Sequence, residues 1–172
     1  MRERELRRRC RRLLKELDIR PPLEVAELCR RVGQQRGKPI RLIPHPLPVP
    51  GPFGAWITTK NADYILYQRE TSKAHQDHII LHELGHILAG HRGDEHDDAL
   101  LTELSPAEEP DAVRKALRRT SYDTDQEREA ETVATIILEW ASVLDRVASR
   151  SSLEETAAQR METALGDRLG WL

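Results

Sequence analysis

The run His82-Glu83-Leu84-Gly85-His86 constrains this chain more than any other part of its sequence. It lies in a segment with helical patterning, and side chains four residues apart on a helix share one face. The two imidazoles can therefore converge on one metal ion, while the glutamate accepts a proton from a water molecule beside that ion. This spacing predicts zinc-assisted hydrolysis of a peptide bond, with Glu83 as the catalytic base.

A catalytic zinc site needs a third protein ligand besides His82 and His86. The metzincin spacing H-E-x-x-H-x-x-G-x-x-H does not occur, because Ala89 and Arg92 stand at the positions of its glycine and third histidine. His91 lies beyond the expected end of the helix, where its geometry as a ligand is poor. We therefore expect a carboxylate from another helix.

The segment 127–134, which begins Glu-Arg-Glu-Ala-Glu, is the best source of that carboxylate. Glu127 and Glu131 share the apolar side of this helix, whereas Glu129 points roughly 160° away at about 100° per residue. We expect Glu127 to bind the metal and Glu131 to orient a ligand histidine. Glu129 remains the alternative ligand. Thr124 and Glu127 also fit a capping box, in which Glu127 would only stabilise the start of the helix.

Other polar side chains lie near these motifs. His78 is one turn before His82 and is expected to support a ligand, to line the cleft or to pack, whereas His75 is expected to be exposed. Tyr122, just before the second motif, could donate a hydrogen bond to an oxyanion, and His91 or His96 could do the same.

The remaining pattern predicts an α+β fold, mostly helical, with a small antiparallel sheet of about three strands packed on the helix that carries the histidines. The helices are expected at about 2–17, from Pro21-Pro22 to Gly33, at 73–89, around 113–117, at 124–147 and at 152–168. The strands are expected at 40–43, 55–59 and 64–67, the last two forming a hairpin through the turn 60–63. With neither a repeat nor a boundary, the chain reads as one domain over 1–172, with a core at about 5–145.

Composition excludes several classes of protein. A net charge of -2 argues against direct binding of nucleic acid, and no apolar run is long enough to span a membrane. The charged N-terminus does not resemble a signal peptide, so we expect a cytoplasmic protein in which Cys10 and Cys29 are reduced. The arginine-rich first helix and the acidic stretch 93–98 are interpreted as solvated surface rather than as docking or metal sites.

The order of these elements, the motif His82-Glu83-Leu84-Gly85-His86 and the segment Glu127-Arg128-Glu129-Ala130 resemble the ImmA/IrrE family of small bacterial and phage metallopeptidases. The resemblance covers roughly residues 5–145. The chain departs from the family pattern in having Glu131 where asparagine is usual, Val133 where phenylalanine is usual, and a longer stretch between the motifs.

The resemblance implies a zincin-like fold and a gluzincin-like zinc endopeptidase with Zn²⁺ as cofactor. It also implies a protein substrate, a helix-turn-helix transcriptional repressor, in a phage, mobile-element or stress-response circuit. An alternative of another class stays open: a regulatory partner that binds a transcription factor without cutting it, with a structural zinc site. The oligomeric state is left open by the sequence.

Overall fold

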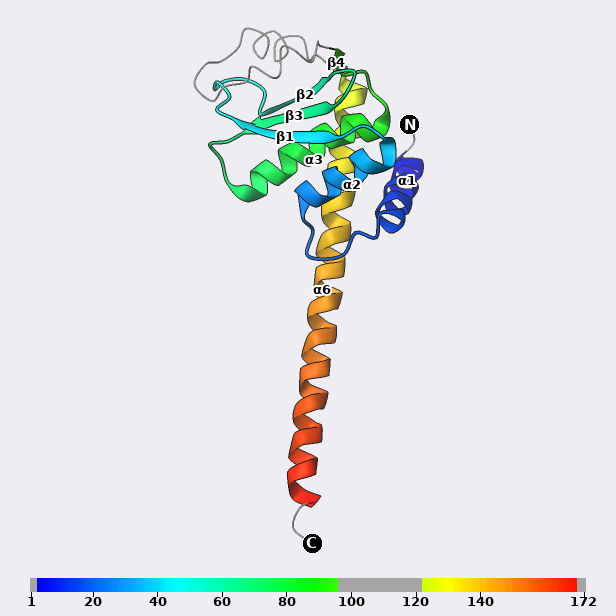
Figure 1. Ribbon diagram of the computed structural model, residues 1–172, viewed down its shortest axis with the longest axis vertical. Helices are drawn as coiled ribbons and strands as arrows, with labels where there is room; N and C mark the ends of the chain where they lie inside the picture. Colours follow the sequence, from blue (N-terminus) through cyan, green and yellow to red (C-terminus); the bar gives the residue numbers. More distant parts are fainter. Residues whose placement is uncertain (1–2, 96–121, 170–172) are drawn as a thin grey trace.

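The computed structural model describes the backbone of residues 3–95 and 122–169 and the side chains of 3–93 and 122–161. The helices within these residues are α1 (Glu3–Glu16), α2 (Val25–Arg36), α3 (Lys73–Ala89) and α6 (Thr124–Leu169). The strands are β1 (Ile40–His45), β2 (Gly54–Thr58), β3 (Asp63–Gln68) and β4 (Asp94–Glu95). The predicted α+β class, with a small sheet beside the histidine helix, is confirmed (Figure 1).

The sheet is mixed rather than antiparallel and has the strand order β1-β3-β2-β4. The predicted hairpin is confirmed, because β2 and β3 pair antiparallel with Trp56 opposite Ile65. However, β3 lies between β1 and β2 and runs parallel to β1, with Leu42 opposite Ile65. The two-residue β4 adds a fourth strand, parallel to the end of β2 at Ile57 and Thr58.

Asp63 opens β3 and is fully buried, although the sequence placed it in the turn 60–63. Its carboxylate accepts hydrogen bonds from Arg36, Trp56 and Thr58 and pairs with Lys38. Burial acts to raise the pKa of Asp63, but these hydrogen bonds outweigh it and the pKa is lowered. The buried carboxylate thus ties α2 to the hairpin.

The end of α2 was predicted at Gly33, and this is wrong. Gly33 is buried inside the helix, where a Cβ atom would lie 2.9 Å from the backbone nitrogen of Ile40. The helix instead ends at Gly37, which has φ 69° and donates its N–H to the carbonyls of the last turn. Gly33 therefore serves close packing on β1.

The predicted bounds of α3, 73–89, are confirmed. The Ser72 hydroxyl accepts a hydrogen bond from the His75 N–H at the start, and Gly90 adopts φ 77° at the end. These caps place His82 and His86 in the C-terminal half of the helix, on the side that faces α6.

The prediction of two C-terminal helices is wrong, because α6 is one continuous helix of 46 residues. Ser152 does not cap a new helix, since its hydroxyl donates to the carbonyl of Ser149 in the preceding turn. Leu153 and Met161, expected to pack, are 70% and 71% exposed. The described part of the chain does not include the side chains of Ala164 and Leu165, the helix expected at 113–117, or His96 and the rest of the acidic stretch after residue 95.

The core lies where α1, α2, α3 and the first half of α6 meet beneath the sheet (Figure 1). It is aliphatic, with Leu14, Leu28, Leu81, Leu84 and Ile137 among its fully buried side chains. Among the described helices, none combines the length and apolar character needed to cross a membrane.

The backbones of α3 and α6 approach each other closely at Gly85, where a Cβ atom would lie 2.6 Å from the carbonyl oxygen of Ala130. We predict that Gly85→Ala destabilises the protein, because overpacking costs about 1–3 kcal/mol and a backbone neighbour cannot rotate away. This cost should exceed the roughly 1 kcal/mol that alanine gains in helix propensity. Urea unfolding measures it, and an unchanged or higher midpoint would contradict the close packing.

Candidate metal centre

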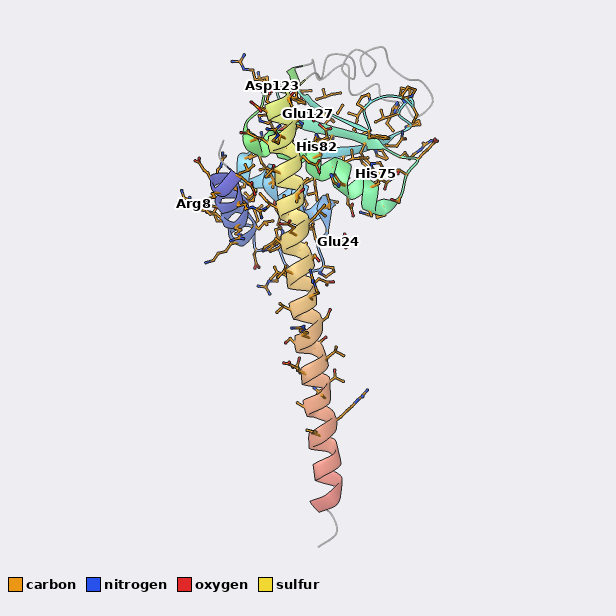
Figure 2. All side chains as sticks on the ribbon, turned by 180° about the vertical axis from the view of Figure 1, so that it is seen from behind. Arg8, Glu24, His75, His82, Asp123 and Glu127 are labelled. Atoms are coloured by element: carbon orange, nitrogen blue, oxygen red, sulfur yellow. The ribbon has the colours of Figure 1, made fainter. Side chains whose placement is uncertain are left out.

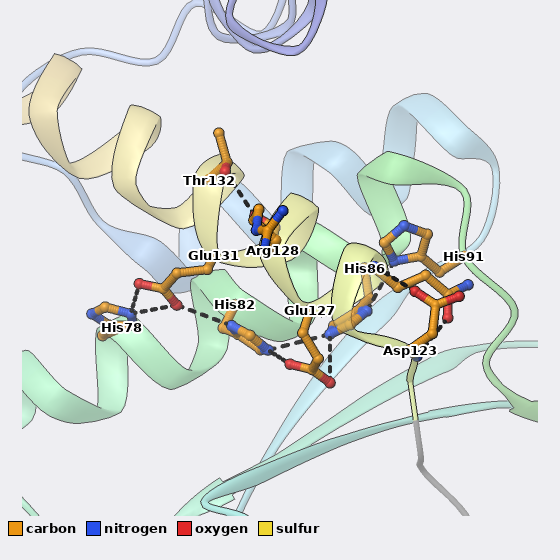
Figure 3. A network of polar contacts seen from close by, with 10 residues as sticks. His78, His82, His86, His91, Asp123, Glu127, Arg128, Glu131 and Thr132 are labelled. Atoms are coloured by element: carbon orange, nitrogen blue, oxygen red, sulfur yellow. Dashed lines mark hydrogen bonds and ion pairs between the residues drawn. The ribbon is translucent and has the colours of Figure 1, made fainter. Parts of the chain in front are cut away.

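The structure brings His82, His86 and Glu127 together at the crossing of α3 and α6 (Figure 3). One ligand atom from each lies within 4.8 Å of the others, and this cluster could hold a metal ion. The Nε2 atom of His82 is 3.1 Å from a Glu127 oxygen and 3.2 Å from the Nε2 atom of His86. Both imidazoles thus direct Nε2 toward the same carboxylate (Figure 2 shows His82 and Glu127 side by side).

Glu127 does not cap α6, a role that the sequence left open. Asp123 caps α6 instead, since its Oδ1 atom accepts from the N–H groups of Asp125 and Gln126. Gln126 completes the capping box by accepting from the Asp123 N–H. The box is thus one residue earlier than Thr124 and Glu127 suggested.

Glu129 lies away from the cluster and contacts His91, with 3.1 Å between its Oε2 atom and His91 Nε2. This agrees with the helical phase that separates Glu129 from Glu127. Of the two candidate carboxylates, the structure therefore places Glu127 with the histidines.

Glu131 occupies the expected supporting position. Its carboxylate lies 3.2 Å from His82 Nδ1 and 3.0 Å from His78 Nε2. Partial burial acts to raise the pKa of Glu131, but the hydrogen bonds with His78 and His82 outweigh burial and lower it. An ionised carboxylate at Nδ1 keeps the proton on that nitrogen and leaves the Nε2 lone pair of His82 for a metal.

His86 has a longer chain of supports, which the sequence did not reveal. Its Nδ1 atom lies 2.9 Å from Nδ1 of His91, whose Nε2 atom faces Glu129. The tautomers are assigned from the carboxylate of Glu129, which can only accept. His91 Nε2–H therefore donates to Glu129, and His91 Nδ1 accepts from His86 Nδ1–H. The Nε2 lone pair of His86 is thereby left for a metal.

The environment of His86 also keeps it neutral. Burial first, then the proximity of His82 and His91, lowers the pKa of His86 to about 3. The Tyr122 ring stacks on it at 3.7 Å between centroids. Tyr122 is thus placed beside a candidate ligand. His91 contacts the candidate ligand His86 and the carboxylate of Glu129, and its suggested role toward an oxyanion stays a prediction.

Glu83 differs from the other carboxylates of the site. It is buried, and its Oε2 atom has no hydrogen-bond partner among the described residues. Burial first, then the charge of Glu127, raises the pKa of Glu83 to about 8. A carboxyl group with a pKa in this range can both accept and return a proton near neutral pH.

An open cavity of about 290 Å³ leads to this group. Its lining includes His82, Glu83, His86 and Glu127 and, on its apolar side, Phe53 and Ile79. His75, expected to be exposed, is half-buried here: the edge of its ring meets Phe53, and its Nδ1 atom lies 2.8 Å from the Thr71 hydroxyl. The cavity therefore gives an external molecule access to the cluster.

Comparison with models of protein families, with curated proteins and with solved structures found no match for this chain. The function proposed below therefore rests on the geometry of the site and on the sequence motifs.

We predict that Glu127→Ala removes metal binding, because it deletes one member of the three-residue cluster. Glu129→Ala should lower affinity by only about 10–100-fold, the range typical of residues that orient a ligand from behind. Titration of the metal-free protein with Zn²⁺ and Co²⁺ measures both. If Glu129→Ala lost the metal and Glu127→Ala retained it, the assignment from helical phase would be wrong.

The raised pKa of Glu83 predicts a pH dependence of stability in the metal-free protein. A carboxyl whose folded pKa lies above its unfolded value of 4.5 stabilises the fold fully below pH 4.5, and this contribution falls as the pH rises to about 8. Glu83→Gln should abolish this contribution. The difference in unfolding free energy between wild type and variant, measured from pH 4.5 to 8.5, isolates it from other titrating groups. A constant difference would contradict a buried, neutral Glu83.

Proposed function

We propose that the protein is a zinc-dependent endopeptidase that hydrolyses a peptide bond in a protein substrate. The observation that carries the proposal is the pairing of a buried, proton-accepting Glu83 with an adjacent His82, His86 and Glu127 cluster in an open cavity. A structural role alone would not require a buried carboxyl group next to the cluster.

The donor set suits zinc. Two neutral imidazoles and one carboxylate match the catalytic pattern of three protein ligands, and each histidine has the supporting partner that such ligands usually have. His82, His86 and Glu127 would hold the ion. When bound, zinc would polarise the scissile carbonyl and lower the pKa of a water molecule toward ~7.

The chain's own residues supply the remaining chemistry. Glu83, which lines the cavity, accepts a proton from the attacking water and returns it to the departing amine. Its raised pKa makes both transfers feasible near neutral pH. Glu131 and His91 keep the imidazoles of His82 and His86 oriented while substrate enters.

The edge of β2 offers a place for the substrate backbone. The Gln68 N–H donates to the Phe53 carbonyl, so the backbone of Phe53 hydrogen-bonds across the hairpin. Because every second residue of an antiparallel strand does so, the N–H groups of Gly54 and Trp56 point away from β3. Within the described residues, β4 covers this edge only at Ile57 and Thr58. An extended peptide added along the open half would pass next to Glu83, because Gly54 lies against that carboxyl group.

An extended substrate implies cleavage in a linker or locally unfolded segment, since a helix cannot present its backbone to a strand edge. Following the resemblance of the motifs, we propose a helix-turn-helix repressor as the substrate and membership of the ImmA/IrrE peptidases. The alternative, a non-proteolytic partner with structural zinc, is less well supported, because structural zinc sites are closed by four ligands, whereas this cluster has three among the described residues and opens to a cavity.

We predict that Glu83→Gln keeps stoichiometric zinc and the native fold but lowers cleavage by at least 10²-fold, because the amide cannot accept the proton. Each variant is expressed together with a candidate helix-turn-helix repressor, and products are read by mass spectrometry. Glu70→Gln, at an exposed carboxylate outside the cavity, is the matched control.

Equal cleavage by wild type and Glu83→Gln would refute the role of Glu83. Loss of DNA binding by the repressor without any cleavage would instead favour the regulatory alternative.

A further inference from the structure

The distal half of α6 stands apart from the rest of the molecule. The helix contains 46 residues and is about 69 Å long at 1.5 Å per residue. Its first half packs on α1 and α3, whereas its second half extends away from the body with no other described element beside it (Figures 1 and 2). Large apolar side chains remain exposed there: Val143 is 54% exposed, Val147 58%, Leu153 70% and Met161 71%.

Val143, Val147 and Met161 belong to a regular stripe, and Leu153 lies beside it, one residue before Glu154. The positions 143, 147, 150, 154, 157 and 161 follow one another at alternating steps of four and three residues. This alternation is the seam spacing of a two-stranded coiled coil. It continues upstream through Val133, Ile136 and Trp140, which pack into the core. The same face of α6 therefore passes from the protein interior into solvent without a change of register.

The two charged residues at the centre of the stripe determine what can cover it. Arg150 and Glu154 are exposed and form no ion pair within the described chain. In a parallel pair of such helices, Arg150 would face Arg150 and Glu154 would face Glu154, and both contacts would be repulsive. In an antiparallel pair centred on residue 152, Arg150 of each helix would face Glu154 of the other.

The same centre pairs the apolar members of the stripe. Val147 falls opposite Ala157, and Val143 falls opposite Met161, because each pair is equidistant from residue 152. Every position of the stripe is thus complementary to another position of the same stripe. This self-complementarity is what a two-fold symmetric interface requires.

A cavity in the body of the protein adjoins the stripe. A cavity of about 260 Å³ lies between α1 and α6 and is lined by Arg7, Ile136, Trp140 and Val143, among others. In the antiparallel register, the helix backbone that follows Met161 of one copy would run past Trp140 and Ile136 of the other. The stripe and the cavity therefore form one continuous surface.

We propose that residues 143–161 of α6 pair antiparallel with the same segment of a second copy of this chain. The Arg150–Glu154 contacts add less stability than apolar residues would, but they specify the orientation of the helices. The pairing is independent of the proposed peptidase activity, since no residue of the metal cluster takes part in it.

Sedimentation velocity of the full-length protein over a range of concentrations tests the pairing. We expect a dimer that Arg150→Glu or Glu154→Arg weakens at least tenfold, because each change places like charges face to face. The double variant Arg150→Glu with Glu154→Arg should restore the wild-type dissociation constant to within about twofold. Glu155→Arg, a change of the same kind one residue outside the stripe, should have little effect. Circular dichroism checks that each variant keeps its helix content.

Disulfide formation tests the orientation. Chains carrying Val147→Cys are mixed with chains carrying Ala157→Cys and oxidised gently, while the native Cys10 and Cys29 remain buried. An antiparallel pair joins unlike chains, whereas a parallel pair joins like chains. A monomer at all concentrations, disulfides between like chains, failure of the double variant to restore the dimer, or an equal effect of Glu155→Arg would overturn the proposal.

Discussion

The structure depends on the close contact between α3 and α6 at Gly85 and Ala130. The absence of a side chain at Gly85 lets the backbone of α6 come within the distance that a Cβ atom would occupy. On α3, His82 and His86 flank Gly85; on α6, Glu127 and Glu131 flank Ala130 at the same spacing. One backbone contact therefore brings two imidazoles and two carboxylates together, because residues one turn apart on each helix face the same neighbour.

Four carboxylates near this contact are distinguished by their surroundings. Glu131 accepts from two histidines and has a lowered pKa, Glu129 contacts His91, and Glu127 faces the Nε2 atoms of His82 and His86. Glu83 alone among them is buried with an unpartnered oxygen and a raised pKa. Neighbouring carboxyl groups in environments that separate their pKa values are a common basis for dividing acid–base roles. In the proposed peptidase, the separation distinguishes the proton acceptor from the groups that hold and orient the metal.

The helix α6 joins two regions of different character. Its first half contributes Val133, Ala134 and Ile137 to the core and Glu127 to the candidate metal site with His82 and His86. Its second half continues the same helical face into solvent with apolar and charged residues in a self-complementary order. Because the helix is uninterrupted, a partner on its distal half would lie at a fixed orientation to the body that carries the site.

The sequence by itself determined the α+β class, the bounds of α3, the hairpin, and the choice of Glu127 over Glu129, since these follow from local patterning, capping residues and helical phase. It misplaced the end of α2, the direction of β1 relative to β3 and the continuity of α6. Gly33 packs on β1 instead of ending α2, and the direction of β1 is set by pairing with a strand about 20 residues further on. Ser152 donates its hydroxyl to the Ser149 carbonyl within the continuing helix instead of capping a new one. The contact of His91 with His86 and Glu129 and the burial of Glu83 were likewise decided by tertiary structure. The capping box of Asp123 and Gln126, by contrast, is a local motif one residue before the one chosen from the sequence. A periodic pattern records which face of one helix is buried, but the partner of each polar atom depends on how closely two backbones approach, and here that distance is set where Gly85 meets Ala130.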